Sequence, residues 1–189
     1  MSGPPDPAAR AAAEPVEVVD YDPAWPAAFE AEATRLRALL PPATIGRIEH
    51  IGSTAVPGLA AKPIVDLMAE TPDYATVARE IAPRLQAEGY EYLWRRSDPI
   101  LPGIDYAWFI RRDPEGRRTH HVHFAPPGSP YWDRVTFRDR LRAHPEEAAA
   151  YATLKRRLAA ERPEDRRGYA RAKGAFVREI LARAAREGV

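Results

Sequence analysis

The stretch Ile48–Met68, IEHIGSTAVPGLAAKPIVDLM, decides how the rest of the chain is interpreted. Residues 47–51 alternate between apolar and polar side chains and predict a short strand. Residues 52–62 are mostly small and predict a loop, and residues 63–69 predict an apolar strand that carries one acid, Asp66. The sequence therefore predicts a strand, a tight loop and a second strand in immediate succession.

This arrangement indicates a phosphate site. Small residues such as Gly52 and Ser53 allow a phosphate to approach backbone amides. Asp66 on the following strand would hold the metal ion that accompanies the phosphate. The alternative is structural, since a single acid in a strand is often neutralised by a neighbouring arginine.

The elements on either side of this stretch predict an α+β fold or a mixed α/β sheet, in either case a mixed β-sheet backed by helices with a C-terminal helical segment. Further strands are expected at 15–21, 90–95, 104–111 and 119–125, and helices from Asp22, Asp73, Ser129, His144 and Arg166. The turn residues DPEG at 113–116 predict an antiparallel hairpin between the last two strands. Pro83 lies inside the second helix and argues against its continuity.

The length of 189 residues fits one domain, which we place at residues 15–189. Residues 1–14, MSGPPDPAARAAAE, show no hydrophobic periodicity and are expected to form a disordered N-terminal tail. They lack the basic start and apolar core of a secretory signal. No stretch of the chain is apolar enough to predict a membrane span, so we expect a cytoplasmic protein.

Charge and cysteine content narrow the classes of partner. Lys and Arg number 28 and Asp and Glu 27, so the net charge of +1 gives no general attraction for nucleic acid or an anionic membrane. An anion site must therefore be local. With no cysteine in the chain, any metal must be bound by histidine, aspartate or glutamate. The oligomeric state is not indicated by the sequence.

Two histidines are candidates to complete a metal site. His121 and His123 lie two residues apart, so they share one face of a predicted strand, with His120 on the other face. They could converge with Asp66, and with His50 or Glu49 of a neighbouring strand, to bind a metal or to act as general acid and base. The alternative is a pair of half-buried histidines bonded to the backbone.

Four more residues are candidates for substrate binding: Lys62, Arg138, Tyr151 and Lys155. Lys62 would pair with a phosphate, unless it is a solvated loop residue. Arg138 would bind a phosphate or carboxylate, unless it forms an internal salt bridge with Asp139. Tyr151 and Lys155 lie four residues apart, a spacing repeated by Tyr169 and Lys173, so each pair lines a cleft or lies on a helix surface.

The segment EHIGSTAVPGLAAKPIVDL closely resembles the signature of the GrpB family, assigned to the nucleotidyltransferase (DNA polymerase beta-like) superfamily. Further matches are THHVH at 119–123, FRDRL at 137–141 and YATLK at 151–155, so the resemblance covers roughly residues 15–182. It implies a nucleotidyltransferase-like fold, a mixed sheet with helices around it. Members of the family also occur fused to dephospho-CoA kinases.

The chain departs from the superfamily at one position. Superfamily enzymes carry two acids spaced by one residue on the strand after Gly-Ser, and both side chains point to one face to bind divalent metal ions. Here Asp66 is followed at that spacing by Met68. The superfamily's third acid, normally from a neighbouring strand, has no obvious counterpart here, although Asp105 could serve if the strand register allows.

The leading hypothesis is a protein that binds a nucleotide or another phosphorylated small molecule and carries out metal-dependent nucleotidyl transfer. Asp66 would bind the metal, Mg or Mn rather than Zn, Gly52 and Ser53 would hold phosphate, and His121 or His123 would be ligand or base. One alternative is a non-catalytic binding or accessory module. Another is a His/Asp metal enzyme with different chemistry on the same scaffold.

Overall fold

The computed structural model describes residues 7–95, 98, 100 and 103–188. It contains a five-stranded mixed sheet of order β1-β2-β5-β4-β3. The strands are β1 Ile48–Ile51, β2 Val65–Glu70, β3 Glu91–Arg95, β4 Tyr106–Arg112 and β5 Arg118–Ala125. β2 and β5 are parallel, whereas the other neighbours are antiparallel. This confirms the α+β fold with a mixed sheet and the predicted hairpin of β4 and β5.

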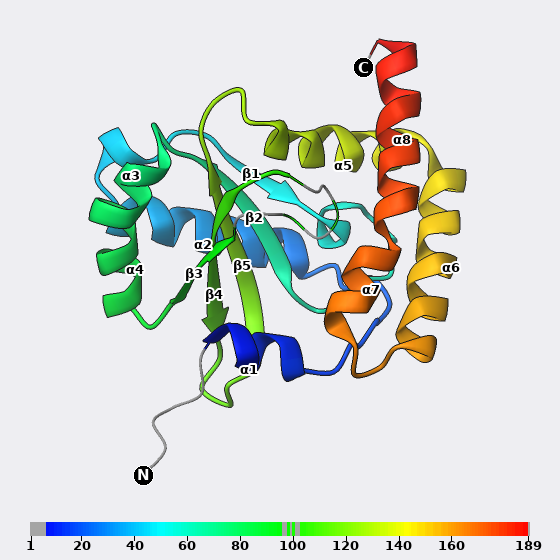
Figure 1. Cartoon of the computed structure of the whole chain (residues 1–189), viewed down its shortest axis with the longest axis horizontal. Coiled ribbons are helices and arrows are strands. Elements are labelled where there is room, and N and C mark those ends of the chain that lie inside the picture. The colour runs from blue at the N-terminus through cyan, green and yellow to red at the C-terminus, as the bar shows by residue number, and fades with distance from the viewer. Residues whose placement is uncertain (1–6, 96–97, 99, 101–102, 189) are drawn as a thin grey trace.

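Helices cover the sheet and gather at one end of the molecule (Figure 1). Their bounds are α1 Pro7–Ala13, α2 Trp25–Leu39, α3 Tyr74–Thr76, α4 Ala82–Ala87, α5 Asp133–Ala143, α6 Pro145–Glu161, α7 Arg166–Ala172 and α8 Gly174–Glu187. In Figure 1, α2 passes behind the strands and α6, α7 and α8 stand together. The last four helices are the expected C-terminal helical segment. Among the described residues, no helix combines the length and apolar character that a membrane crossing requires.

The second helical unit is continuous despite Pro83. A π-helical turn, Val77–Ile81, joins α3 to α4, and Pro83 lies at the start of α4. Proline has no amide hydrogen to donate and its ring crowds the preceding turn, so the wider π turn accommodates it. Pro83 therefore does not interrupt the helix that the sequence predicts from Asp73.

Strand alternation separates two environments across the sheet. Leu67 of β2 and Val122 and Phe124 of β5 face α2 and form the main apolar core with Trp25 and Leu36. The alternate residues of the same strands face the opposite side, which the C-terminal helices cover. That side carries the polar residues described below.

Residues 15–21 do not form the expected strand. Within them only Val19 is paired, in an isolated antiparallel bridge with Ala61. The amide of Val16 donates to the carbonyl of Pro163, near α7, at 2.7 Å. The segment therefore runs between the loop before β2 and the C-terminal helices, which leaves it no neighbouring strand to pair with along its length.

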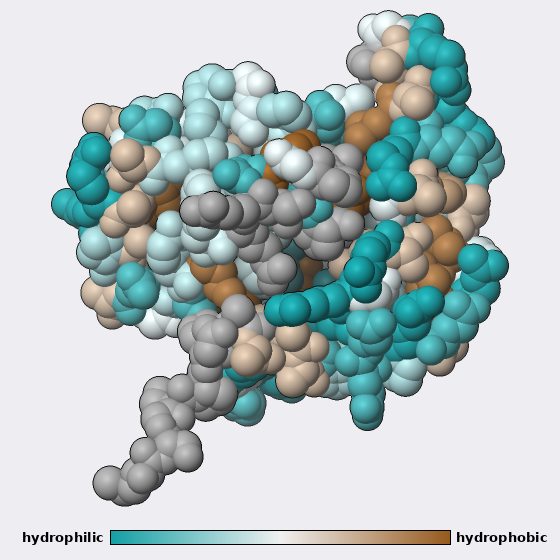
Figure 2. All heavy atoms as spheres, viewed as in Figure 1, coloured by the Kyte–Doolittle hydropathy of each residue, from teal (hydrophilic) through white to brown (hydrophobic). Residues whose placement is uncertain are grey.

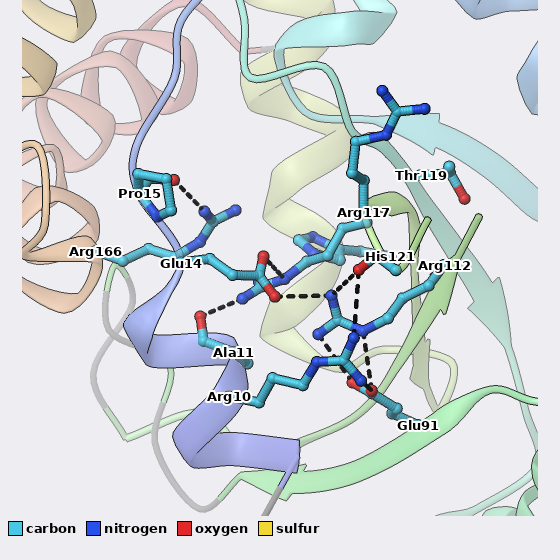
Figure 3. Close-up of polar contacts among 12 residues, drawn as sticks. Arg10, Ala11, Glu14, Pro15, Glu91, Arg112, Arg117, Thr119, His121 and Arg166 are labelled. Atoms are coloured by element: carbon cyan, nitrogen blue, oxygen red, sulfur yellow. Dashed lines mark hydrogen bonds and ion pairs between the residues drawn. The ribbon is translucent and has the colours of Figure 1, made fainter. Parts of the chain in front are cut away.

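Residues 7–13 form a helix within the segment for which the sequence predicts a disordered tail. Residues 7–15 form an N-terminal strap that includes α1, and Ala11 is buried. Glu14 forms ion pairs with Arg112 at 2.7 Å and with Arg118 at 2.6 Å, as Figure 3 shows for Arg112. Arg118 also donates a hydrogen bond to the carbonyl of Ala11. Side chains about a hundred positions away thus hold the strap, and local sequence gives no sign of them; residues 1–6 lie outside the described part.

Replacing Glu14 with alanine should destabilise the protein. The side chain of Arg118 is 2% exposed, so its guanidinium group would lose its carboxylate partner while remaining buried. We expect the free energy of unfolding, measured by urea denaturation, to fall by about 1–3 kcal/mol.

The matched control is Asp20→Ala, which removes the exposed partner of Arg156. Exposed ion pairs contribute little, so this variant should be as stable as the unchanged protein. Equal stability of the Glu14 and Asp20 variants would contradict the role given to the strap.

Candidate functional site

A cavity of about 660 Å³ lies between the sheet, the C-terminal helices and the strap. Its volume is in the range of sites for nucleotide-sized ligands. Hydrophilic side chains border a hollow on the face seen in Figure 2. The walls come from the loop at Gly52–Thr54, from β2 and β5, from α7 and from Ala11 and Ala12 of the strap. The loop and strand of the stretch Ile48–Met68 thus form one side of the cavity.

Asp66, His121 and His123 meet at the sheet side of the cavity. The parallel register of β2 and β5 places Asp66 opposite His121 and Met68 opposite His123. Oδ1 of Asp66 lies 2.9 Å from Nδ1 of His121 and 3.8 Å from Nε2 of His123. One ligand atom from each of the three residues lies within 4.8 Å of the other two. The predicted convergence of these three residues is confirmed.

Burial and hydrogen bonding set the charges in this cluster. Burial lowers the pKa of His121 to about 3 and also lowers the pKa of His123. Burial alone would raise the pKa of Asp66, but the hydrogen bonds of His121 and His123 outweigh it and hold that pKa well below its ordinary value. At neutral pH the cluster is therefore one carboxylate and two neutral imidazoles.

These groups fit a divalent cation. Neutral imidazole nitrogens and a carboxylate oxygen are metal ligands, and the hydroxyl of Tyr131 at 2.9 Å from Nδ1 of His123 orients that ring. Since a carboxylate only accepts, Nδ1 of His121 donates to Asp66 and its Nε2 carries a lone pair. That Nε2 is buried with no hydrogen-bond partner among the described residues. Two imidazoles favour Mn, Fe or Zn over Mg, which prefers oxygen ligands.

Gly52 packs directly on Asp66. A Cβ atom at position 52 would lie 2.6 Å from Oδ2 of Asp66, and the backbone there has φ of +72°. Both facts require glycine. The following residue, Ser53, begins a 3₁₀ turn, Ser53–Ala55, and lines the cavity. The Gly-Ser pair predicted to approach a phosphate therefore lies beside the carboxylate predicted to hold its metal.

The chain contains three lysines, and all three line this cavity: Lys62, Lys155 and Lys173. Burial lowers the pKa of Lys155 to about 6 and that of Lys173 to about 8. Burial also lowers the pKa of Lys62, and repulsion from Arg166 and Lys173 adds to this effect. The cavity therefore gathers the basic side chains of all three lysines, although the chain as a whole is nearly neutral.

Tyr151 and Lys155 belong to the cavity and not to a helix surface. Lys155 is 2% exposed, donates a hydrogen bond to the carbonyl of Ala60, and has its Nζ 4.7 Å from the ring centroid of Tyr151. Tyr169 and Lys173 repeat this contact at 4.5 Å. Of the two interpretations left open by the spacing, the structure supports the cleft.

Two candidates lie outside the cavity. His50 is paired with Leu67, so it shares the opposite face of the sheet, where it stacks on Phe29 at 4.8 Å and bonds Thr54 at 3.0 Å. The expectation that it reaches Asp66 is wrong. Arg138 is bound by Glu49 at 2.8 Å and by Asp139 at 2.7 Å. It therefore makes the internal salt bridge that was its alternative, and Glu49 is occupied by it.

The acids expected beyond Asp66 are not found in the cavity. Met68 is fully buried among apolar and aromatic residues. Asp105 is exposed before β4, and its backbone carbonyl accepts a hydrogen bond from Tyr74 at 2.6 Å. The expectation that Asp105 supplies a third acid is wrong, because the face of β4 turned to His121 and His123 carries Tyr106, Trp108 and Ile110.

Sequence reasoning missed several cavity residues. Arg118 is buried by the strap, and Arg134 pairs with Asp98 at 2.5 Å. Arg166 contacts the strap: its guanidinium group donates a hydrogen bond to the carbonyl of Pro15 at 2.9 Å, as Figure 3 shows. The only available signal was the repeated Tyr-Lys spacing, which marks the helical wall of the cavity at Tyr169 and Lys173.

Comparison with known proteins identifies the relatives of this chain. The family model described as GrpB protein matches residues 15–183. A UPF0157 protein of Pseudomonas aeruginosa is 44% identical over 172 residues, which are 89% of this chain and 67% of that protein. A dephospho-CoA kinase of Mycolicibacterium paratuberculosis is 31% identical over 90% of this chain, which spans 46% of the kinase.

A solved structure shares the fold. The crystal structure of the conserved protein GrpB from Enterococcus faecalis superposes with a TM-score of 0.74 and 35% identity. The match covers 90% of this chain and 98% of that one. Most of the N-terminal strap precedes the residues that the family model matches.

Replacing Lys155 with methionine should change how stability depends on pH. The pKa of Lys155 is about 6 in the folded chain and ordinarily 10.5, so between these values the unfolded chain binds more protons at this site. The free energy of unfolding of the unchanged protein should therefore rise with pH across that interval, relative to the variant, by up to about 1.4 kcal/mol per pH unit.

Chemical denaturation of both proteins at pH 6, 7, 8 and 9 checks this. The difference between them isolates Lys155 from the other titrating groups. Parallel stability curves for the two proteins would show that the amine keeps its charge in the folded state.

Proposed function

The chain belongs to the GrpB protein family, and from that premise we propose that its cavity binds a nucleotide or another phosphorylated small molecule. Phosphate would lie against Gly52, Ser53 and Lys62. A divalent cation would be held by Asp66, His121 and His123. The bound ion would supply Lewis-acid stabilisation of phosphate charge.

One observation carries this proposal: basic side chains outnumber acidic ones among the residues that line the cavity, and some of the basic ones have no carboxylate partner among the described residues. Lys62, Lys173 and Arg166 make no ion pair within 4.0 Å with any described acid. Lys173 is buried, and a buried cation destabilises a fold unless an anion compensates it. A phosphorylated ligand provides that compensation, and lysine is a frequent phosphate ligand.

Nucleotidyl transfer is the catalytic form of the proposal. The residues of this chain would orient the phosphate by the Gly52 and Ser53 backbone and by Lys62. Asp66 would stay ionised beside two neutral imidazoles, so the site is ready for a cation at neutral pH. The apolar Met68 supports one cation and not the pair used by superfamily enzymes.

A non-catalytic binding module is the second candidate. Met68 at the second acid position and the exposed Asp105 favour it, because both remove ligands from the reaction centre. In that case the residues that would position a reacting phosphate would bind a signalling molecule or a cofactor-like ligand without transferring a group from it. The two candidates share the site and differ in turnover.

Isothermal titration should detect metal-dependent binding of a nucleoside triphosphate. ATP, GTP, CTP and UTP are titrated separately, without metal and with Mg, Mn or Zn, into the unchanged protein and Asp66→Asn. We expect binding that the metal strengthens, and at least about tenfold weaker binding in Asp66→Asn because a metal ligand is lost.

Asp105→Asn is the matched control, since it removes an exposed acid outside the cavity. It should bind as the unchanged protein does. Release of pyrophosphate from a bound triphosphate would separate transfer from binding alone. Metal bound without affinity for any triphosphate would overturn the nucleotide proposal and favour a His/Asp metal centre with other chemistry.

A further inference from the structure

We infer that the helical wall of the cavity carries a second anion site, formed by Arg166, Tyr169 and Lys173, so that the cavity accepts two anionic groups at once. The inference rests on the proposed function, in which a first anion lies against Gly52 and Ser53. It adds that the group bound at the helical wall is anionic. This group is either the far end of the same ligand or a second substrate.

The local sequence places the three residues together. Arg166, Tyr169 and Lys173 are separated by three and four positions along α7 and the turn that follows it, which is the spacing of one helix face. All three line the cavity. They approach it from the helical side, whereas Asp66, His121 and His123 come from the sheet.

Two buried polar atoms of this wall have no hydrogen-bond partner in the described part of the chain. Nη1 of Arg166 donates to the carbonyl of Pro15 at 2.9 Å, but its Nη2 is buried with no hydrogen-bond partner among the described residues. The same holds for the hydroxyl of Tyr169, whose side chain is 1% exposed. Two donors without acceptors at one place match the oxygens of a phosphate or carboxylate.

The charges distinguish this wall from the rest of the cavity. Arg118 and Arg134 also line the cavity, but Glu14 compensates the first at 2.6 Å and Asp98 the second at 2.5 Å. Arg166 and Lys173 form no such pair with a described acid. Lys173 is 8% exposed, and the contact that accompanies its amine is the ring of Tyr169 at 4.5 Å.

The strap keeps Arg166 directed toward this site. Figure 3 shows its guanidinium group anchored on Pro15, while the neighbouring Glu14 is engaged by other arginines. Glu14 makes its ion pairs with Arg112 and Arg118, so it does not neutralise Arg166. One edge of the guanidinium is thus fixed and the other remains for a ligand.

This arrangement selects the class of ligand. A neutral or cationic acceptor would leave Arg166 and Lys173 uncompensated, whereas an anionic group would pair with both. One molecule with a phosphate chain would span the two sites. Two molecules, a phosphate compound and an anionic acceptor, would fill them separately.

Inorganic phosphate, pyrophosphate and tripolyphosphate test this without reference to a base. Each is titrated into the unchanged protein, Lys173→Met and Arg186→Met, the last removing an exposed arginine of α8 away from the cavity. If one ligand spans both sites, tripolyphosphate should bind at least about tenfold tighter than phosphate. If the sites fill separately, two phosphates should bind each chain.

Lys173→Met should bind tripolyphosphate no more tightly than phosphate, or should bind one phosphate instead of two. Its affinity for the first phosphate should stay within about twofold of that of the unchanged protein. Arg186→Met should match the unchanged protein. The second site would be overturned if the unchanged protein bound a single phosphate per chain and had equal affinities for phosphate, pyrophosphate and tripolyphosphate. This outcome does not depend on whether Lys173→Met folds.

That result would leave the proposed function intact, because binding of a nucleoside triphosphate with metal is measured separately. Conversely, if the unchanged protein bound neither a nucleoside triphosphate nor phosphate, both the proposed function and the second anion site would be overturned. The two failures are therefore distinguishable.

Discussion

The carboxylate of Asp66 is a partly buried charge on a central strand of the mixed sheet, and the surrounding side chains keep it ionised. A buried charge is tolerated only when hydrogen bonds and opposite charges replace the water it has lost. Here His121 donates to it, and the cations of the cavity attract it. Gly52 is required to be glycine because its backbone lies against the same carboxylate. The loop, the parallel strand pair and the helical wall all depend on this group.

The cavity uses its two kinds of cation differently. Carboxylates pair with the buried Arg118 and the partly buried Arg134, and in the first case the pair holds the strap. Arg166 is held by the carbonyl of Pro15 instead. The lysines of the cavity are not paired in this way with any described acid. Arginine keeps its charge in any environment, whereas a buried lysine gives up its proton more readily and regains it when an anion arrives. A lysine-lined cavity therefore costs less stability when empty of anions than an arginine-lined one would.

Local periodicity predicted the faces of the central strands correctly. Counting alternate residues placed His121 and His123 with Asp66, and His120 away from them, because the side-chain period of a strand is two. The same counting across β1 and β2 would have excluded His50, but it needs the register of the pair, which pairs His50 with Leu67. Glu14 and Arg118 are joined across more than half of the chain, and no local pattern reports such a pair. The strap and the pairing of Arg138 with Glu49 were missed for this reason.

The packing around Met68 makes the absence of a second acid a property of the fold and not of one position. Met68 lies on the same face as Asp66, but it is fully buried against Ile51, Trp108 and Tyr131. Its partner across the parallel pair is His123, which is fixed by Tyr131. A carboxylate at this position would be buried in an apolar and aromatic cluster, so restoring the acid alone would not restore a two-metal centre. The imidazoles of β5 occupy the place where further carboxylates would act. Any cation bound here is therefore held by nitrogen as well as oxygen, and this chemistry separates the site from one built on acids alone.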